Sequence, residues 1–259
     1  MVKDRLYAII QTILIGIFIY AAINILGIMN NYNKGDKIYS KPQEKYFVIE
    51  QADNDKSNEN EKYTLDLAQL KEINPDIVAW IYIADTKISY PLLQCDNNDK
   101  YLKQTYNNIK SDFGSIFIDF RNSVDMSDRN SIIYGHNTKN GSMFGSLKKY
   151  KDANYFKQHP KISIIYAEKT YEYEIFSVYT TLVSGPAYVN NFNNDDEFKS
   201  FISATRGLSV IDTGITPNIQ DKIITLSTCT SRSPDERFVV HARLAGITQN
   251  NNPIEFDKF

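Results

Sequence analysis

Cysteine and histidine are scarce in this chain of 259 residues, which holds 2 Cys and 3 His. The cysteines, Cys95 and Cys229, are too few for a disulfide scaffold and form no C-x-x-C pair that would indicate zinc. Glycine-rich loops of the Walker or dinucleotide-binding type are also missing, which excludes the common nucleotide-binding motifs. We therefore expect neither a bound metal nor an organic cofactor.

An excess of positive charge is missing as well. The 29 Lys and Arg residues against 31 Asp and Glu residues give a formal net charge of -2. Proteins that bind nucleic acid usually carry a basic surface, so we expect no nucleic-acid partner. The chain does have 42% hydrophobic and 13% aromatic residues. That composition is sufficient for the core of one globular domain with accessory segments.

Charged residues are absent from the apolar run at residues 6–29. About 20 apolar residues in a helix cross a bilayer, so this run is long enough to do so. The end of the run and the residues after it, GIMNNYNKG at 27–35, make a poor signal-peptidase site, and the run lacks the polar face of a buried core helix. Lys3 and Arg5 favour a cytoplasmic N-terminus at residues 1–5. We predict a transmembrane signal anchor over a cleaved signal peptide or a core helix.

A polar segment at residues 30–62 follows the anchor, rich in Asn, Lys, Asp and Glu apart from a short YFVIE run. This composition is typical of a flexible stalk. The extracellular folded domain is predicted at residues 63–259. It opens with a helix, because Leu67, Leu70 and Ile73 recur at helical spacing before an Asn-Pro pair ends the pattern.

Short strands dominate the rest of the domain. A helical pattern, DDEFKSFISATR, interrupts them after the sixth strand. Many short strands with few helices predict a mainly β domain, a closed or nearly closed barrel decorated by helices. The strand-like stretches, separated by turn-rich segments, are AWIYI, ISYPLLQ, SIFID, SIIYGH, KISIIYA, YEYEIFSVYTTLV, KIITLSTC and RFVVHARLAGI.

The main candidates for chemistry lie in the segment KIITLSTCTSRSPDERFVVHARL. Cys229 ends one predicted strand, and Arg237 opens the next after a short polar turn. If these strands pair antiparallel, the guanidinium emerges beside the thiol. A permanent, forked positive charge can favour the thiolate and hold an oxyanion or a carbonyl oxygen. The alternative is a structural cysteine, since free cysteines are often buried.

A cysteine nucleophile also needs a base or a proton donor. His136 ends a predicted strand and is followed by a turn-rich loop, a position that active-site residues often occupy. Asn137, Thr138 and Asn140 in that loop are candidates to order the ring. A capping or surface histidine is the alternative.

The other histidines and the second cysteine suit catalysis less well. His241 lies four residues beyond Arg237, about 13 Å along a strand, and would face the middle of the Cys229 strand. His159 lies in the turn KQHPK and is interpreted as a solvated loop residue. Cys95 is a core residue or a disulfide partner of Cys229, and that disulfide would exclude a catalytic thiol.

Together these residues resemble the sortases, most closely class B. The stretch TLSTC at 225–229 matches the TLxTC signature of the family, and Arg237 matches its catalytic arginine. YGHN at 134–137 matches its histidine motif, and the MFGSL run fits too. NPDIVAWIYI and DFGSIFIDFRN are also similar to class B. The resemblance covers about residue 63 to the C-terminus.

The resemblance implies an eight-stranded β-barrel with N-terminal helices and a helix between strands six and seven. It implies a cell-wall sorting transpeptidase that recognises an Asn-Pro-x-Thr-like motif near the C-terminus of a secreted protein. Such an enzyme cleaves after the Thr and joins the new carboxyl group to a peptidoglycan amine. The implied partners are surface proteins with this motif, the peptidoglycan precursor and the membrane. Class A sortases can use calcium, but class B resemblance gives no reason to expect it.

On this interpretation Cys229 is the nucleophile, His136 the acid and base, and Arg237 the partner of the oxyanion. The thiolate attacks the Thr carbonyl, and a thioester holds the protein until an amine attacks it. Three alternatives remain open at this stage. They are a secreted cysteine endopeptidase that transfers to water, a catalytically silent surface-binding module, and a pilin-polymerising sortase.

Further residues are weaker candidates for the site. The backbone N–H of Thr230 is a candidate second oxyanion donor. Thr228 is a candidate for substrate binding, although stabilising the strand end is its alternative role. Asn97 or its neighbour Asn98, beside a strand end, is a candidate for the lining of the site. Tyr134 is interpreted as a core residue.

Overall fold

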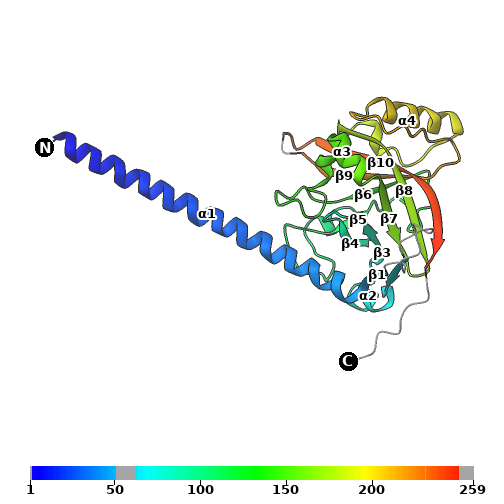
Figure 1. Ribbon diagram of the computed structural model, residues 1–259, viewed down its shortest axis with the longest axis horizontal. Coiled ribbons are helices and arrows are strands. Elements are labelled where there is room, and N and C mark those ends of the chain that lie inside the picture. The colour runs from blue at the N-terminus through cyan, green and yellow to red at the C-terminus, as the bar shows by residue number, and fades with distance from the viewer. Residues whose placement is uncertain (1, 51–61, 231, 251–259) are drawn as a thin grey trace. The chain divides into compact units, whose positions relative to one another are not determined.

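The computed structural model describes residues 2–50, 62–230 and 232–250 and divides the chain into two units, residues 1–41 and 42–259 (Figure 1). Most of helix α1 (Val2–Tyr46) belongs to the first unit, and the helix includes the predicted anchor. Its stretch Ile9–Tyr46 contains an 18-residue window with a mean hydropathy of 2.3, so the helix is long and apolar enough to cross a membrane. The large apolar side chains described between Tyr7 and Met29 are exposed, which suits a lipid environment better than water.

Eight strands of the second unit form a closed barrel, which confirms the predicted fold (Figure 1). The spatial order is β10-β8-β7-β3-β4-β5-β6-β9, and the barrel closes where β9 pairs with β10. The strands are β3 (Ile77–Tyr82), β4 (Ser89–Leu93), β5 (Ile116–Ile118), β6 (Asn130–Tyr134), β7 (Lys161–Ile165), β8 (Lys169–Leu182), β9 (Ile223–Cys229) and β10 (Glu236–Gln249).

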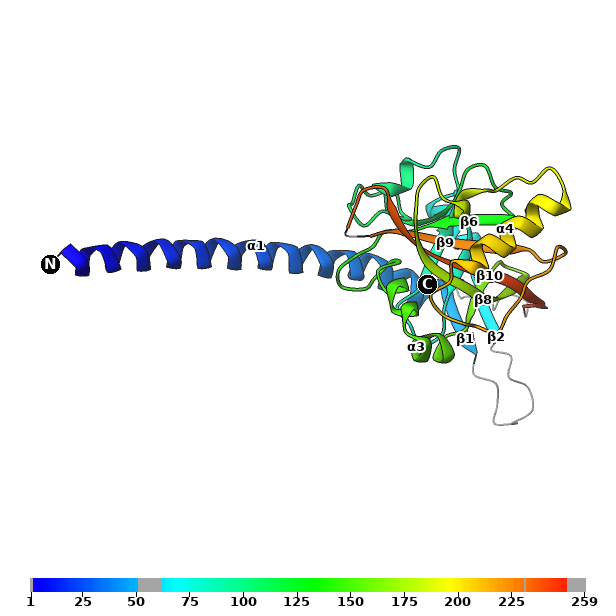
Figure 2. The same cartoon turned by 90° about the horizontal axis from the view of Figure 1, so that it is seen from above.

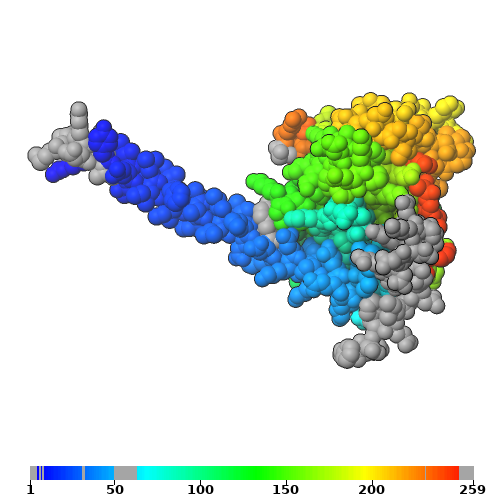
Figure 3. Space-filling view, in the orientation of Figure 1, coloured from blue at the N-terminus to red at the C-terminus, as the bar shows by residue number. Residues whose placement is uncertain are grey.

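Short helices decorate the barrel. The longest of them lies between the sixth and seventh barrel strands, as the resemblance implied, and covers the outside of β8 and β9 (Figures 2 and 3). The helical elements of the second unit beyond α1 are α2 (Leu67–Ile73), η1 (Lys100–Leu102), η2 (Leu147–Lys151), α3 (Ala153–Gln158), η3 (Pro186–Tyr188) and α4 (Asp195–Gly207).

Helix α4 has a clear start and one apolar face. The side chain of Asn194 accepts a hydrogen bond from the backbone N–H of Glu197, which caps the helix. Phe198 and Phe201 then pack against Phe176 of β8 in one buried cluster. This cover explains why β9 does not alternate between buried and exposed residues. Its first six residues are all buried, because one face meets the barrel interior and the other meets this layer.

The folded unit begins earlier than the predicted boundary at residue 63. Strand β1 (Phe47–Glu50) lies within the segment expected to be a flexible stalk, and it pairs antiparallel with β2 (Lys62–Leu65). The reason is aromatic packing: the Phe47 ring is buried and stacks on Trp80 at 5.2 Å and on Tyr63 at 5.9 Å between centroids. Residues 51–61 of the predicted stalk lie outside the described residues.

We expect Phe47→Ala to lower the free energy of unfolding by about 3 kcal/mol, because it leaves a cavity beside Trp80. Urea denaturation of the chain in detergent measures this change. Ile49→Ala in the same strand is the matched control, since Ile49 is 38% exposed and should cost much less. Equal, small effects of the two substitutions would mean that β1 does not contribute to the folded unit and belongs to the predicted stalk.

Candidate active site

Strand β9 pairs with two strands, its sequence neighbour β10 and the distant β6. It pairs antiparallel with β10 in a register that sets Cys229 directly opposite Arg237, as the hairpin argument predicted. On its other edge it pairs parallel with β6, where Tyr134 is opposite Ser227. The hydrogen bond from Gly135 N to Ser227 O, at 3.1 Å, extends this pairing by one residue. His136 therefore leaves β6 at the same end of the barrel as the cysteine.

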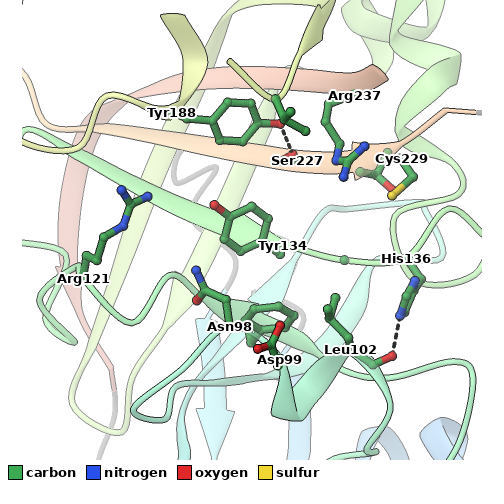
Figure 4. Close-up of a pocket in the computed structure, with 14 residues that line it drawn as sticks. Asn98, Asp99, Leu102, Arg121, Tyr134, His136, Tyr188, Ser227, Cys229 and Arg237 are labelled. Carbon is green, nitrogen blue, oxygen red and sulfur yellow. Dashed lines mark hydrogen bonds between the residues drawn. The ribbon is translucent and has the colours of Figure 1, made fainter. Parts of the chain in front are cut away.

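A pocket of about 420 Å³ opens at this end of the barrel. Figure 4 shows Cys229, Arg237 and His136 on one side of it, so the structure brings together the three predicted catalytic side chains. The complete lining is Asn98, Asp99, Leu102, Phe117, Arg121, Tyr134, Gly135, His136, Val183, Tyr188, Ser227, Thr228, Cys229 and Arg237.

Both cysteines are free thiols, which removes the disulfide alternative. Cys229 is exposed at the pocket, so the structure does not support a buried structural role for it. Cys95 is half-buried, and its sulfur contacts the carbonyl oxygen of Asn97 at 3.2 Å. Within the described residues, no group of three or more His, Cys, Asp or Glu side chains is placed to hold a metal ion.

A backbone carbonyl orients the ring of His136. The Nε2 atom lies 2.7 Å from the carbonyl oxygen of Leu102, an acceptor, so Nε2 carries the proton of this hydrogen bond. Thr138 of the following loop, one of the predicted partners, donates to the carbonyl of Ser142 instead. Gly114 packs against the ring, because a Cβ added to this residue would lie only 2.9 Å from His136 Cδ2. Its φ of 55° also favours glycine.

The guanidinium of Arg237 is anchored at the base of the β9–β10 hairpin. Its Nη1 donates to the carbonyl oxygens of Pro234 and Glu236. Within the described residues, Nε and Nη2 donate to no other group and are available at the pocket. A cation with donors left over beside an exposed thiol can stabilise a thiolate or an oxyanion.

The weaker candidates fare differently. The backbone N–H of Thr230 donates to the carbonyl of Glu236 at 3.1 Å, because the ladder continues past Cys229. It is therefore not free to donate to an oxyanion. Thr228 lines the pocket, and its buried hydroxyl has no hydrogen-bond partner among the described residues.

Of the two neighbouring asparagines, Asn98 lines the pocket and Asn97 does not. The Asn97 side chain accepts hydrogen bonds from the backbone of Asp99 and Lys100, both at 2.9 Å, at the start of η1. Asn97 is thus a turn-stabilising residue, and its expected place in the lining is corrected to Asn98.

His241 and His159 lie away from the pocket. His241 faces Thr225 in the middle of β9, as predicted, and is completely buried. Burial lowers its pKa to about 3, so the ring is neutral at ordinary pH. His159 is buried too, which contradicts the solvated turn expected for it. Its Nδ1 lies 2.9 Å from the carbonyl of Ala84, and its ring packs on Tyr155.

An ion pair between the exposed Arg121, at the side of the pocket away from the cysteine, and the buried Asp119 was not predicted from the sequence (Figure 4). Arg121 donates to the two carboxylate oxygens of Asp119 at 2.9 and 2.8 Å, and the Tyr134 hydroxyl donates at 2.9 Å. Burial alone would raise the pKa of Asp119, but these hydrogen bonds outweigh it and hold the pKa below its ordinary value. Burial and the Asp119 charge raise the pKa of Tyr134, which keeps its hydroxyl protonated.

Tyr188 also escaped the sequence argument. Its hydroxyl lies 2.7 Å from Ser227 Oγ, and its ring stacks on Tyr134 with an interplanar angle of 7°. Tyr134, interpreted as a core residue, thus lines the pocket as well. The YGHN motif, which begins with Tyr134, is a sequence signal that could have placed this residue at the site. No local pattern marks Tyr188, because its contacts are distant in sequence.

Comparisons with known proteins agree with this geometry. A family model described as the Sortase domain matches residues 81–245. Sortase B of Listeria monocytogenes is 34% identical over 94% of this chain and 98% of its own length. The crystal structure of sortase B from B. anthracis in complex with AAEK1 has a TM-score of 0.71 and 37% identity, over 83% and 98% of the two chains. The Staphylococcus aureus sortase B-substrate complex has a TM-score of 0.65 and 33% identity, over 71% and 85%.

The buried, neutral ring of His241 predicts a specific pH dependence of stability. Between pH 6.5 and 3 the unfolded chain binds a proton at this position and the folded chain does not, so stability falls as the pH falls. The slope is about 1.4 kcal/mol per pH unit. Denaturation at pH 6.5 and 4.5 should show a drop for the wild type that is roughly 2 kcal/mol larger than for His241→Gln. Parallel curves of stability against pH for the two proteins would mean that the His241 ring takes up its proton over the same pH range in the folded and the unfolded chain.

Proposed function

Since this chain belongs to class B of the sortase family, we propose that it is a membrane-anchored cell-wall sorting transpeptidase with Cys229, His136 and Arg237 as its catalytic residues. The observation that carries the proposal is the register of β9. It places an exposed thiol opposite a guanidinium, with an imidazole on the wall of the same pocket. That is the constellation a cysteine transpeptidase requires.

The thiolate of Cys229, opposite Arg237 in the β9–β10 ladder, attacks the carbonyl carbon of the scissile Thr. The Nε and Nη2 donors of Arg237 stabilise the negative oxygen of the tetrahedral intermediate. Because the Thr230 N–H is engaged in the ladder, the arginine carries this task without it. Thr228, next to Cys229 in the pocket lining, contacts the substrate beside the reacting bond.

His136 exchanges protons through Nδ1. The carbonyl of Leu102 requires a proton on Nε2 in both charge states of the ring, so Nδ1 is the nitrogen that gains or loses one. Imidazolium donates from Nδ1 to the leaving amine as the thioester forms. Neutral imidazole then takes a proton from the incoming amine, which attacks the thioester and closes a new amide. The energy of the peptide bond is retained through the thioester, so no nucleotide is needed.

The donor and acceptor substrates follow from the family. The donor is a surface protein with an Asn-Pro-x-Thr-like motif, and the substrate complex of the Staphylococcus aureus relative supports a pocket that binds peptide. The acceptor is an amine of a peptidoglycan precursor, and a sortase B crystal structure complexed with triglycine supports a short peptide amine. The apolar stretch of α1 anchors the chain, with the N-terminus in the cytoplasm and the catalytic unit outside.

Transfer to an amine distinguishes a transpeptidase from an endopeptidase with the same residues. We expect the wild-type chain to cleave a peptide containing Asn-Pro-x-Thr after the Thr. With added triglycine it should form the ligated product, because the amine competes with water for the thioester. Mass spectrometry of the products measures the partition. Cys229→Ala should give neither product, whereas hydrolysis alone at saturating triglycine would favour the endopeptidase.

Arg237→Lys tests the forked guanidinium. We expect kcat/KM to fall by about 100-fold or more, because an ammonium group loses the two-donor geometry aimed at the oxyanion. Arg243→Lys, in the same strand, is the matched control. Its side chain pairs with Glu174 at 2.7 Å and lines no part of the pocket, so turnover should persist. Near-normal turnover by Arg237→Lys would exclude this arginine from the mechanism.

A further inference from the structure

A chain of hydrogen bonds lies behind the pocket wall, between the barrel and the layer of α4 and η3. Tyr179 Oη lies 3.0 Å from His241 Nε2, and His241 Nδ1 lies 2.8 Å from Thr225 Oγ1. Thr225 then donates to Asn130 Oδ1 at 2.7 Å. The four residues come from β8, β10, β9 and β6, and each is at most 1% exposed. None of them lines the pocket or belongs to the proposed catalytic group.

The direction of this chain has one consistent assignment. Asn130 Nδ2 donates to the carbonyls of Ala187 and Val189, so its Oδ1 must face Thr225. The single proton of the Thr225 hydroxyl goes to that oxygen, and the hydroxyl must accept from His241 Nδ1–H. Because burial keeps the ring neutral, Nε2 accepts from the hydroxyl of Tyr179. The orientation of the Asn130 amide and the tautomer of His241 are therefore coupled through the Thr225 hydroxyl.

The chain ends on the segment that carries Tyr188. Asn130 holds the backbone carbonyls on either side of this tyrosine, at 3.3 Å for Ala187 and 2.8 Å for Val189. Ala187 is completely buried and packs against Tyr179, the first member of the chain. From that fixed backbone the Tyr188 ring reaches the pocket, where its hydroxyl meets Ser227 (Figure 4). The position of Tyr188 in the pocket wall thus depends on the hydrogen bonds that Asn130 donates to the two flanking carbonyls.

We propose that Asn130, oriented through Thr225 by His241, is a positioning residue that sets Tyr188 as a wall of the peptide-binding pocket. This inference rests on the proposed function, because the pocket must bind a peptide for its wall to matter. The chain of hydrogen bonds from Tyr179 to Asn130, here called the relay, makes no hydrogen bond to the three proposed catalytic residues within the described residues. Its loss should therefore weaken substrate binding and leave the chemical step largely intact.

The experiment compares Thr225→Val with Thr225→Ser in the full chain in detergent. Valine keeps the shape but removes the hydroxyl, which leaves the Asn130 amide and His241 Nδ1–H without their partner. We expect Thr225→Val to raise KM for the sorting peptide about 10-fold, with kcat within about 3-fold of the wild type. Serine restores the hydroxyl, so Thr225→Ser should return KM to near the wild-type value.

Thr205→Val is the matched control, because Thr205 is equally buried and its hydroxyl donates to Phe201 O at 2.8 Å, with no link to Asn130. Its KM should not change. The rate of alkylation of Cys229 by iodoacetamide should be the same in all these variants. If Thr225→Val fails to fold, Tyr179→Phe removes only the first hydroxyl and should raise KM about 3-fold.

Each outcome decides the proposal. An unchanged KM in folded Thr225→Val, or in Tyr179→Phe where Thr225→Val fails to fold, overturns it. So does an equal rise in Thr205→Val, or a fall in kcat at constant KM. Absence of turnover by the wild-type chain removes the proposed function itself, and this inference falls with it. An active wild type with an unmoved KM in the variants refutes the relay alone.

Discussion

The pairing of β9 with both of its neighbours is the constraint on which the rest of the site depends. Its antiparallel register with β10 sets Cys229 opposite Arg237, and its parallel register with β6 brings His136 to the same end of the barrel. A slip of one residue in either register would turn the cysteine or the arginine to the other face of the sheet. Full burial of Ile223–Thr228 on both faces of the strand opposes such a slip.

The pocket is supported by groups that do no chemistry themselves. The ion pair of Asp119 and Arg121 and the hydroxyl of Tyr134 stabilise the side away from the cysteine, and the buried carboxylate of Asp119 has hydrogen-bond partners on both of its oxygens. The carbonyl of Leu102 fixes the ring of His136. A pocket built on rigid hydrogen-bonded elements can hold a peptide in one orientation, which is what transfer between two peptides requires.

Sequence patterns predicted most of the fold because the elements are locally marked. Alternating and apolar strands, turn-rich connections and a capped amphipathic helix each carry a local signal, so the barrel and the helix between its sixth and seventh strands were expected. The stalk was predicted too long, since composition does not reveal that Phe47 stacks on Trp80. The orienting partner of His136 was also misassigned. The true partner, Leu102 O, is a backbone atom 34 positions away in the sequence.

The sequence by itself indicated the candidate catalytic side chains and the family, because a thiol, an imidazole and a guanidinium lie within short, specific motifs. It also determined that the Cys229 strand and the Arg237 strand form a hairpin, since a short polar turn joins them. Only the tertiary structure decided that the Thr230 N–H is engaged, that Asn98 lines the pocket and how Tyr188 is held. Tyr188 in particular is held by Ser227 and Asn130, which are distant in sequence, and such contacts leave no local pattern.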